Sequence, residues 1–275
     1  MAADNYTIRE LQALLLSMLE SFHNYCQENN YQYYIVGGTL LGAVREKGFI
    51  AWDDDVDIAM PRSDYERFIQ TYNGEYRIAH YSKSKNCVYP YMKLLHPTLT
   101  LVNIVDEQFG FKDKVLVQFD IYPIDGVGND LSKARIYARR IQKIRHFTYL
   151  NISRDRASTF LKRVILGMIR LIPSYWLITY QDRMMKNFKY SDSQYITRWR
   201  MPSLPENIVH KNVFENSVLL DFEGLKLSAP RNFDEYLKSV YGNYMAPEKG
   251  NDGLRHGIKS NYIINEEDFK TPTSL

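Results

Sequence analysis

The chain has 275 residues, of which 45% are hydrophobic, and its 35 Lys and Arg residues nearly balance its 32 Asp and Glu residues. This length and composition are typical of a folded protein with a substantial core, and a net charge of +3 is too small to indicate nucleic-acid binding. The two cysteines, Cys26 and Cys87, are too few for a disulfide framework. The first residues are too acidic, and the apolar run behind them too short, for a signal peptide, so we expect a cytoplasmic location.

The first half of the chain is expected to form a mixed sheet with intervening helices. Thr7 and Glu10 form a capping box that begins a helix with apolar residues at helical spacing, and Asn29-Asn30 ends it. The aromatic and branched run 31–36 predicts a strand that leads into Gly37-Gly38. The other elements expected in this half are a short helix (39–46), a strand (53–60), a helix (63–72) and strands at 76–80, 89–95, 99–105 and 115–124.

The second half is expected to be largely helical. Residues 131–150 are basic and helical, and residues 159–189 form a long helical stretch that Pro173 interrupts. Asn232 and Glu235 predict a second capping box, for a helix that Gly242 ends. These patterns predict an α+β protein with residues 1–150 as its sheet-bearing core and residues 151–275 as a helical C-terminal part packed on that core, in one compact unit.

The run WDDDVDIAM places four aspartates within five positions. If the run is a strand, Asp53, Asp55 and Asp57 share one side of it. The other side, which faces the core, carries Val56, Ile58 and Met60, with Asp54 at the mouth of the strand where it reaches solvent. Carboxylates two residues apart on a strand can converge on one divalent cation such as Mg²⁺ (or Mn²⁺), which prefers oxygen ligands. The alternative is a solvated acidic turn, which does not explain why Asp55 and Asp57 alternate with apolar residues.

A third carboxylate for such a site is expected at Asp120. It lies between Phe119 and Ile121 in a strand-like run, where an isolated carboxylate is costly to desolvate unless it is paired or bound to a metal. Asp125 follows in what reads as a turn and ranks lower.

The glycine pair before the aspartates predicts an anion site. Gly37, Gly38 and Thr39 stand between a strand and a helix, where free backbone N–H groups can hold a phosphate. Arg45 and Lys47 follow on the connection to the aspartates and either contact phosphate oxygens or form a solvated basic turn.

The segment GGTLLGAVREKGFIAWDDDVDI resembles the signature of the LicD family of phosphocholine transferases, which are relatives of fukutin in the nucleotidyltransferase superfamily. Weaker similarity occurs at residues 91–100, 118–127 and 222–245. The resemblance implies a polymerase-β-like nucleotidyltransferase sheet as the catalytic core. It also implies that Asp55, Asp57 and Asp120 are the metal ligands and catalytic residues, and that Gly37, Gly38 and Thr39 form the phosphate-facing turn.

The activity that this resemblance implies is transfer of phosphocholine from CDP-choline to a sugar hydroxyl of a cell-surface glycan, lipopolysaccharide or teichoic acid precursor, with release of CMP. Lys93 is the expected further phosphate contact, and Trp52 with Tyr122 are the candidates for an aromatic cage around choline. Alternatives are a CDP-dependent transferase of another polyol or amino-alcohol phosphate, a true nucleotidyltransferase, a glycosyltransferase and a scaffold with an inactive site. The Gly-Gly arm argues against the glycosyltransferase, and the intact aspartates argue against the scaffold.

The most apolar stretch, residues 159–179, is not expected to span a membrane, because Arg170 lies near its centre. It predicts an amphipathic helix that lies on the anionic inner surface of a membrane next to a lipid-linked acceptor, or else packs on the core or at a dimer contact, which is commoner. The apolar face comprises Phe160, Leu161, Val164, Ile165, Met168, Ile169 and Ile172.

Overall fold

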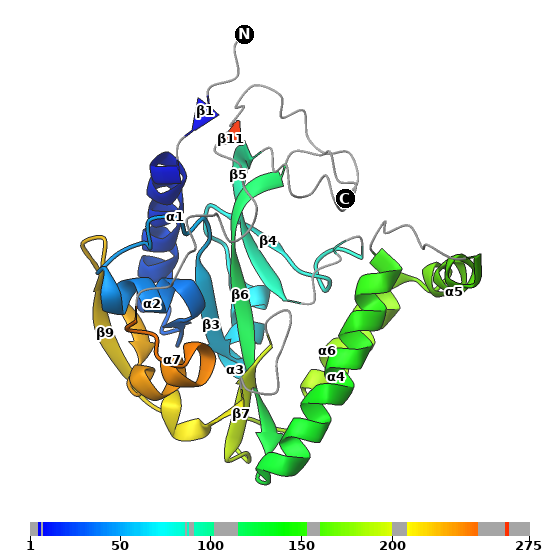
Figure 1. Ribbon diagram of the computed structural model, residues 1–275. Helices are drawn as coiled ribbons and strands as arrows, with labels where there is room; N and C mark the ends of the chain where they lie inside the picture. The colour runs from blue at the N-terminus through cyan, green and yellow to red at the C-terminus, as the bar shows by residue number, and fades with distance from the viewer. Residues whose placement is uncertain are drawn as a thin grey trace.

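A seven-stranded mixed sheet forms the centre of the computed structural model (Figure 1). Five strands follow the order β2-β3-β6-β5-β4, and β7 extends the pairing from β6 to β8. The pair β3–β6 is parallel, whereas the other pairs in this sheet are antiparallel. The strands are β2 (Tyr34–Ile35), β3 (Asp57–Pro61), β4 (Arg77–Ala79), β5 (Met92–Leu101), β6 (Val115–Gly128), β7 (Tyr195–Arg198) and β8 (Ile208–His210). The structure describes residues 5–6, 8–85, 87, 91–101, 115–152, 160–199, 208–246 and 262–263.

One face of the sheet carries the main hydrophobic core, and it is covered by α1 (Ile8–Glu28) and α3 (Arg62–Thr71). The ring centroid of Phe22 on α1 lies 5.6 Å from that of Phe119 on β6 and 5.5 Å from that of Phe68 on α3. Because neighbouring residues of a strand point to opposite faces, this packing directs the side chain of Asp120 to the other face.

The opposite face is bordered by three helices: α2 (Gly37–Arg45), α4 (Leu131–Ile152) and α7 (Phe233–Tyr241). Figure 1 shows α2 and α7 in front of the sheet, and α4 along its right side with α6 (Ser174–Met185) against it and α5 (Phe160–Arg170) at its end. A hairpin of β9 (Ser217–Phe222) and β10 (Leu225–Pro230) follows a 3-10 helix at Lys211–Val213, and β1 (Asn5–Tyr6) pairs with β11 (Tyr262–Ile263).

A buried ion-pair network fixes the C-terminal part on the sheet. Arg62 on α3 donates from Nε to Asp125 Oδ1 of β6 (2.7 Å) and from Nη1 to Asp182 Oδ1 of α6 (3.1 Å). Asp182 also accepts from Lys186 Nζ (2.7 Å) and from the Tyr81 hydroxyl (2.5 Å). Asp125 therefore lies within β6 and not in the expected turn, and its ion pair with Arg62 joins β6 to α3 and α6.

The α+β class predicted from the sequence is confirmed, and so are the interruption at Pro173 and the end of α7 at Gly242. The C-terminal part is helical at α5, α6 and α7, but it also contributes β7 and β8 to the sheet. None of the helices in the described ranges has the length and hydropathy needed to cross a bilayer.

Two local predictions need correction. The strand expected from residue 53 begins at Asp57, because the backbone before it turns: Asp53 N–H donates to the Ile50 carbonyl (2.9 Å). The capping box expected at Asn232 is wrong, since its side chain instead donates to the Asn212 carbonyl (3.1 Å). Thr7 and the runs at 89–90 and 102–105 lie outside the described residues.

Candidate active site

Strand register gathers acidic and basic side chains on one face of the sheet. Asp57 of β3 stands directly opposite Asp120 of β6, and Asp120 stands opposite Lys93 of β5. Adjacent strands are about 4.8 Å apart, so these three side chains rise from neighbouring positions. Tyr122, two residues after Asp120, shares the same face.

Asp120 accepts hydrogen bonds from two of these neighbours. Lys93 Nζ donates to its Oδ1 (2.6 Å) and the Tyr122 hydroxyl donates to its Oδ2 (2.8 Å). Lys93 is itself buried, as is Tyr122. The Lys93 ammonium therefore compensates part of the negative charge that Asp120 brings to this face.

The loop before β3 brings three further carboxylates to the site. Gln12 of α1 holds this loop, because its Nε2 donates to the carbonyls of Ile50 (3.1 Å) and Asp53 (2.9 Å). Burial raises the pKa of Asp55 well above its usual range, and the carboxylates of Asp57, Asp53, Asp120 and Asp54 raise it further. Asp55, Asp57 and Asp120 therefore belong to one electrostatic cluster.

The glycine pair makes room for this cluster. A Cβ on Gly37, whose φ is +58°, would lie 1.8 Å from Asp57 Oδ2, and a Cβ on Gly38 would lie 2.6 Å from Asp53 Oδ2. Thr39 adds a direct contact, since its hydroxyl accepts a hydrogen bond from the Asp57 N–H (2.9 Å). The first turn of α2 is thus packed against the carboxylates, next to the place where a phosphate was predicted.

Two buried arginines at this face were not predicted from the sequence. Arg198 ends β7 opposite Ile124, is 3% exposed, and places Nη1 3.9 Å from Asp57 Oδ2. Its guanidinium lies 5.3 Å from the ring centre of Tyr122 and 5.9 Å from that of Tyr236 on α7. Its Nε and Nη1 are buried and have no hydrogen-bond partner among the described residues. Such donors are costly to bury unless an anion meets them.

Arg145 of α4 approaches the same face from the other side. It is buried, and desolvation lowers its pKa to about 10, while the charges of Tyr91 and Tyr122 oppose that shift. The Tyr91 and Tyr122 rings lie 4.7 Å apart. The face therefore carries a cluster of carboxylates with two buried guanidinium groups and an aromatic pair beside it.

Two residues predicted for the site, Arg45 and Trp52, are not part of the described acidic cluster. Arg45 is at the C-terminal end of α2, about 12 Å along the helix from Gly37 at 1.5 Å per residue, and pairs with Glu46 (3.7 Å). Trp52 precedes the acidic loop and packs half-buried against the main core. The described contacts join Tyr122, but not Trp52 or Arg45, to the carboxylates.

The donor set fits a hard divalent cation. Oxygens of Asp53, Asp54 and Asp55 lie within 4.8 Å of one another, and Asp55 is also coupled to Asp57 and Asp120. Asp55 belongs to both sets. We favour Asp57 and Asp120 as its partners, because strand pairing holds their backbones in register whereas Asp53 and Asp54 lie on the loop.

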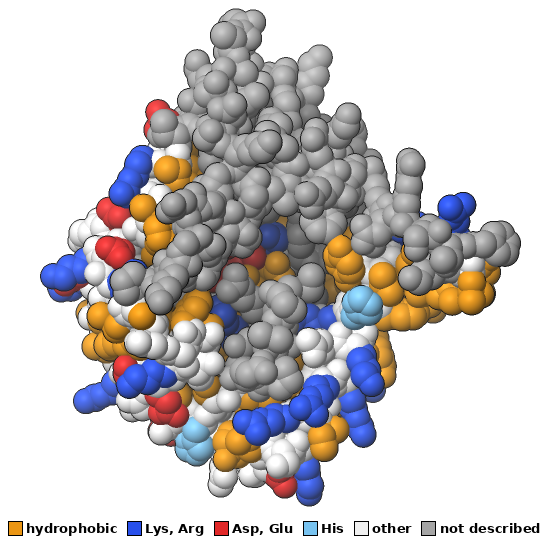
Figure 2. Space-filling view, viewed as in Figure 1, with side chains coloured by type: hydrophobic (Ala, Val, Ile, Leu, Met, Phe, Trp, Pro, Cys, Tyr) orange, Lys and Arg blue, Asp and Glu red, His pale blue; other side chains and the backbone are white. Residues whose placement is uncertain are grey.

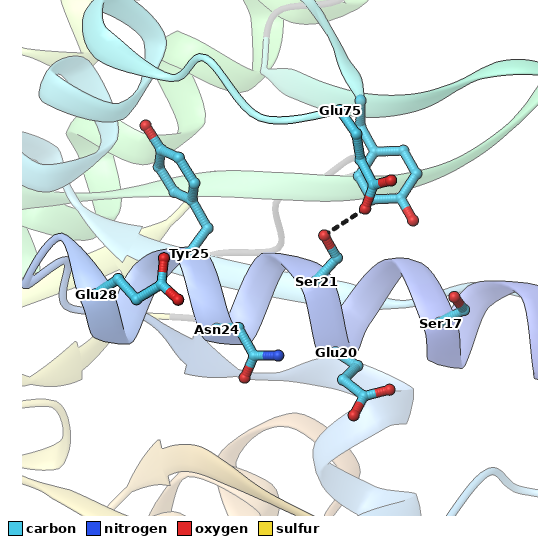
Figure 3. Close-up of a pocket in the computed structure, with 8 residues that line it drawn as sticks. Ser17, Glu20, Ser21, Asn24, Tyr25, Glu28 and Glu75 are labelled. Atoms are coloured by element: carbon cyan, nitrogen blue, oxygen red, sulfur yellow. Dashed lines mark hydrogen bonds between the residues drawn. The ribbon is translucent and has the colours of Figure 1, made fainter.

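A separate depression on the outer surface of α1 lacks these features. Ser17, Glu20, Ser21, Asn24, Tyr25 and Glu28 line it with residues of the segment before β4 (Figure 3). Ser21 Oγ donates to Glu75 there (2.6 Å). It is open to solvent and away from the acidic cluster, so it is not a candidate for the active site.

Comparisons with known proteins find a family model and several relatives that this chain resembles. Residues 30–123 match the family described as LicD/FKTN/FKRP, nucleotidyltransferase domain, and this match includes Gly37, Asp55, Asp57 and Asp120. The chain is 28% identical over 273 residues to the lipopolysaccharide cholinephosphotransferase LicD of Haemophilus influenzae, covering 94% of this chain and 98% of that protein. An uncharacterised protein of Rickettsia typhi is 44% identical over 66 residues, 24% of this chain and 21% of that protein.

Proposed function

We propose that this chain, whose residues 30–123 match the LicD/FKTN/FKRP nucleotidyltransferase domain, is a metal-dependent phosphocholine transferase that uses CDP-choline as donor. The acceptor in this proposal is a sugar hydroxyl of a lipopolysaccharide-type cell-surface glycan, in line with the name of the Haemophilus relative. A teichoic acid precursor is the alternative acceptor. The observation that carries the proposal is the cluster of Asp55, Asp57 and Asp120 beside two buried arginines.

In the proposed reaction, the acceptor hydroxyl oxygen forms a bond to the phosphorus that carries choline. The bond from that phosphorus to the oxygen shared with CMP breaks, and CMP leaves with the electron pair. The hydroxyl proton passes to a carboxylate of the cluster. Transfers of this kind depend mainly on positioning and on compensation of charge.

The proposed ligands Asp55, Asp57 and Asp120 would hold Mg²⁺ or Mn²⁺, which supplies charge neutralisation on the diphosphate. Arg198 would donate from Nε and Nη1, which have no hydrogen-bond partner among the described residues, to phosphate oxygens from the β7 side. Lys93, which pairs with Asp120, would contact a phosphate oxygen of the donor. Gly37, Gly38 and Thr39 complete the phosphate side at the start of α2.

Choline recognition in this proposal centres on Tyr122. Its ring packs against Tyr91 and already accepts one cation, the Arg198 guanidinium, on its face. An aromatic face that stabilises a guanidinium also suits a quaternary ammonium. Trp52 stays a prediction for the same cage.

The test is product identification. The full chain is incubated with Mg²⁺, CDP-choline and a purified lipopolysaccharide glycan, and the acceptor is examined by mass spectrometry. We expect CMP and an acceptor heavier by phosphocholine. An acceptor heavier by CMP, with free phosphocholine, would instead identify a nucleotidyltransferase. Asp57→Asn should abolish turnover, whereas Asp221→Asn, on the exposed β9–β10 hairpin, should leave it unchanged.

A further inference from the structure

The outer surface of α5 and the start of α6 carries a patch of exposed apolar side chains. Leu171 is 83% exposed, Leu161 and Trp176 are 69% exposed, and Met168 is 57% exposed. Figure 2 shows hydrophobic side chains gathered along α5 at the right of the molecule. We call this the α5–α6 patch; its members are Leu161, Val164, Ile165, Met168, Leu171, Trp176 and Tyr180. Of the predicted amphipathic face, Leu161, Val164, Ile165 and Met168 are exposed, whereas Ile172 is half-buried and Ile169 is buried. The side chain of Phe160 lies outside the described part of the chain.

The orientation of α5 is fixed by contacts on its other side. Ile169 is buried, and Asn151 at the end of α4 donates from Nδ2 to the carbonyls of Ile169 (2.6 Å) and Ile172 (2.9 Å). These bonds cap the C-terminal end of α5. The patch is therefore held outward, and its exposure is a property of the fold.

The same part of the chain is strongly basic. Residues 131–189 contain fourteen Lys and Arg but only two acidic residues, whereas the rest of the chain is net acidic. Exposed members flank the patch on α5 at Arg163 and Arg170, and continue along α4 at Arg139, Arg140 and Lys143. Figure 2 shows Lys and Arg side chains along α4, next to the patch.

We propose that the α5–α6 patch docks this protein on the surface of an anionic lipid bilayer. Apolar side chains next to Lys and Arg suit the boundary between lipid headgroups and acyl chains, where the charges meet anionic lipid. Trp176 and Tyr180 are of the residue types that favour this boundary. An eleven-residue helix such as α5 is about 16 Å long, so it lies along the surface.

A second copy of the chain is the less suitable occupant. A two-fold contact apposes the same surface on both subunits, so the strongly basic segments would face each other and repel. An anionic leaflet instead compensates the charge. The inference does not depend on the proposed transfer reaction, although it would hold the enzyme beside a lipid-linked acceptor.

The test is sedimentation of the full chain with lipid vesicles. We expect binding to vesicles of phosphatidylcholine with phosphatidylglycerol, at least tenfold weaker binding to phosphatidylcholine alone, and weakening by salt. The variant Leu171→Glu/Trp176→Glu should lose at least tenfold in vesicle binding. Leu219→Glu is the matched control, because Leu219 is also exposed but lies on β9, and it should bind as the unmodified chain does.

Two results would overturn the inference. One is equal binding of the unmodified chain and the double variant to anionic vesicles. The other is no vesicle binding together with a dimer, detected by analytical ultracentrifugation, that the double variant abolishes; this would make the patch a subunit contact. Turnover with a soluble glycan acceptor should be the same in the double variant, which separates this inference from the proposed function.

Discussion

Gly37→Ala gives the most specific prediction about the acidic cluster. Gly37 has φ +58°, and a Cβ there would lie 1.8 Å from Asp57 Oδ2, whereas real Cβ atoms stay at least 3.0 Å from such atoms. The Asp57 carboxylate must therefore move by about 1.2 Å, the difference between these distances. Asp57 is buried beneath the start of α2, and its backbone N–H is bonded to Thr39, so the displacement changes the position of a proposed ligand.

The magnitude follows from two separate costs. A non-glycine residue in the left-handed region costs about 1–2 kcal/mol of folding free energy, and the overpacking adds about 1–3 kcal/mol. A displacement of about 1 Å at a reacting group lowers turnover by about 100-fold. We therefore expect Gly37→Ala to be folded but to lose about two orders of magnitude in kcat.

The matched control is Gly224→Ala. Gly224, in the β9–β10 turn, also has a positive φ, +86°, but a Cβ at this position would have no atom within 4 Å among the described residues. The variant should lose about 1–2 kcal/mol of stability and keep its activity. Denaturant unfolding and CMP release, measured on both variants, give the comparison. Equal activities in the two variants would refute the argument that Gly37 exists to accommodate Asp57.

Three other predictions follow from buried groups. Burial lowers the pKa of His80 to about 4, so the unfolded chain binds a proton that the folded chain does not between pH 6.5 and about 4. The free energy of unfolding should therefore fall by up to about 3 kcal/mol as the pH drops through this window. Urea unfolding as a function of pH measures this decline, and the His80→Asn variant should lack the part that His80 contributes. Arg198→Met should lower kcat by about 100- to 1000-fold, with partial activity in Arg198→Lys; unchanged steady-state kinetics would remove Arg198 from the site. Arg62→Met should cost about 3–5 kcal/mol of stability because it leaves Asp125 and Asp182 buried without their shared cation, while kcat of the folded fraction stays unchanged. Thermal unfolding of Arg62→Met, together with its activity measured at low temperature, tests this last prediction.

The sequence predicted the acidic residues because the signal is local. Asp57 and Asp120 are charged residues within apolar runs, and strand alternation was enough to place each on the face away from the core. Their direct opposition in β3 and β6 is a matter of register, which single strands do not specify. Asp53 to Val56 were misassigned because the turn at Ile50 and its hold by Gln12 depend on contacts across about forty residues.

The sequence carries local signals for both buried arginines. Arg145 falls in helical register with Ala134, Ala138, Ile141 and Thr148, all buried, so helical spacing alone places it on the inner face of α4. Arg198 lies between Thr197 and Trp199, in the strand-like run 195–199 that also contains Ile196. Their arrival beside the carboxylates depends on how β7 and α4 pack onto β6, which no short segment encodes.

The central claim is that Asp55, Asp57 and Asp120 hold a divalent cation on the donor diphosphate. Electron paramagnetic resonance of Mn²⁺, titrated into the protein with and without CDP-choline, measures this binding directly. The account predicts saturable binding that CDP-choline strengthens and that Asp57→Asn or Asp120→Asn abolishes, with Mg²⁺ as a competitor. Mn²⁺ binding that is absent from the unmodified protein, or that either variant retains with the affinity of the unmodified protein, would contradict it.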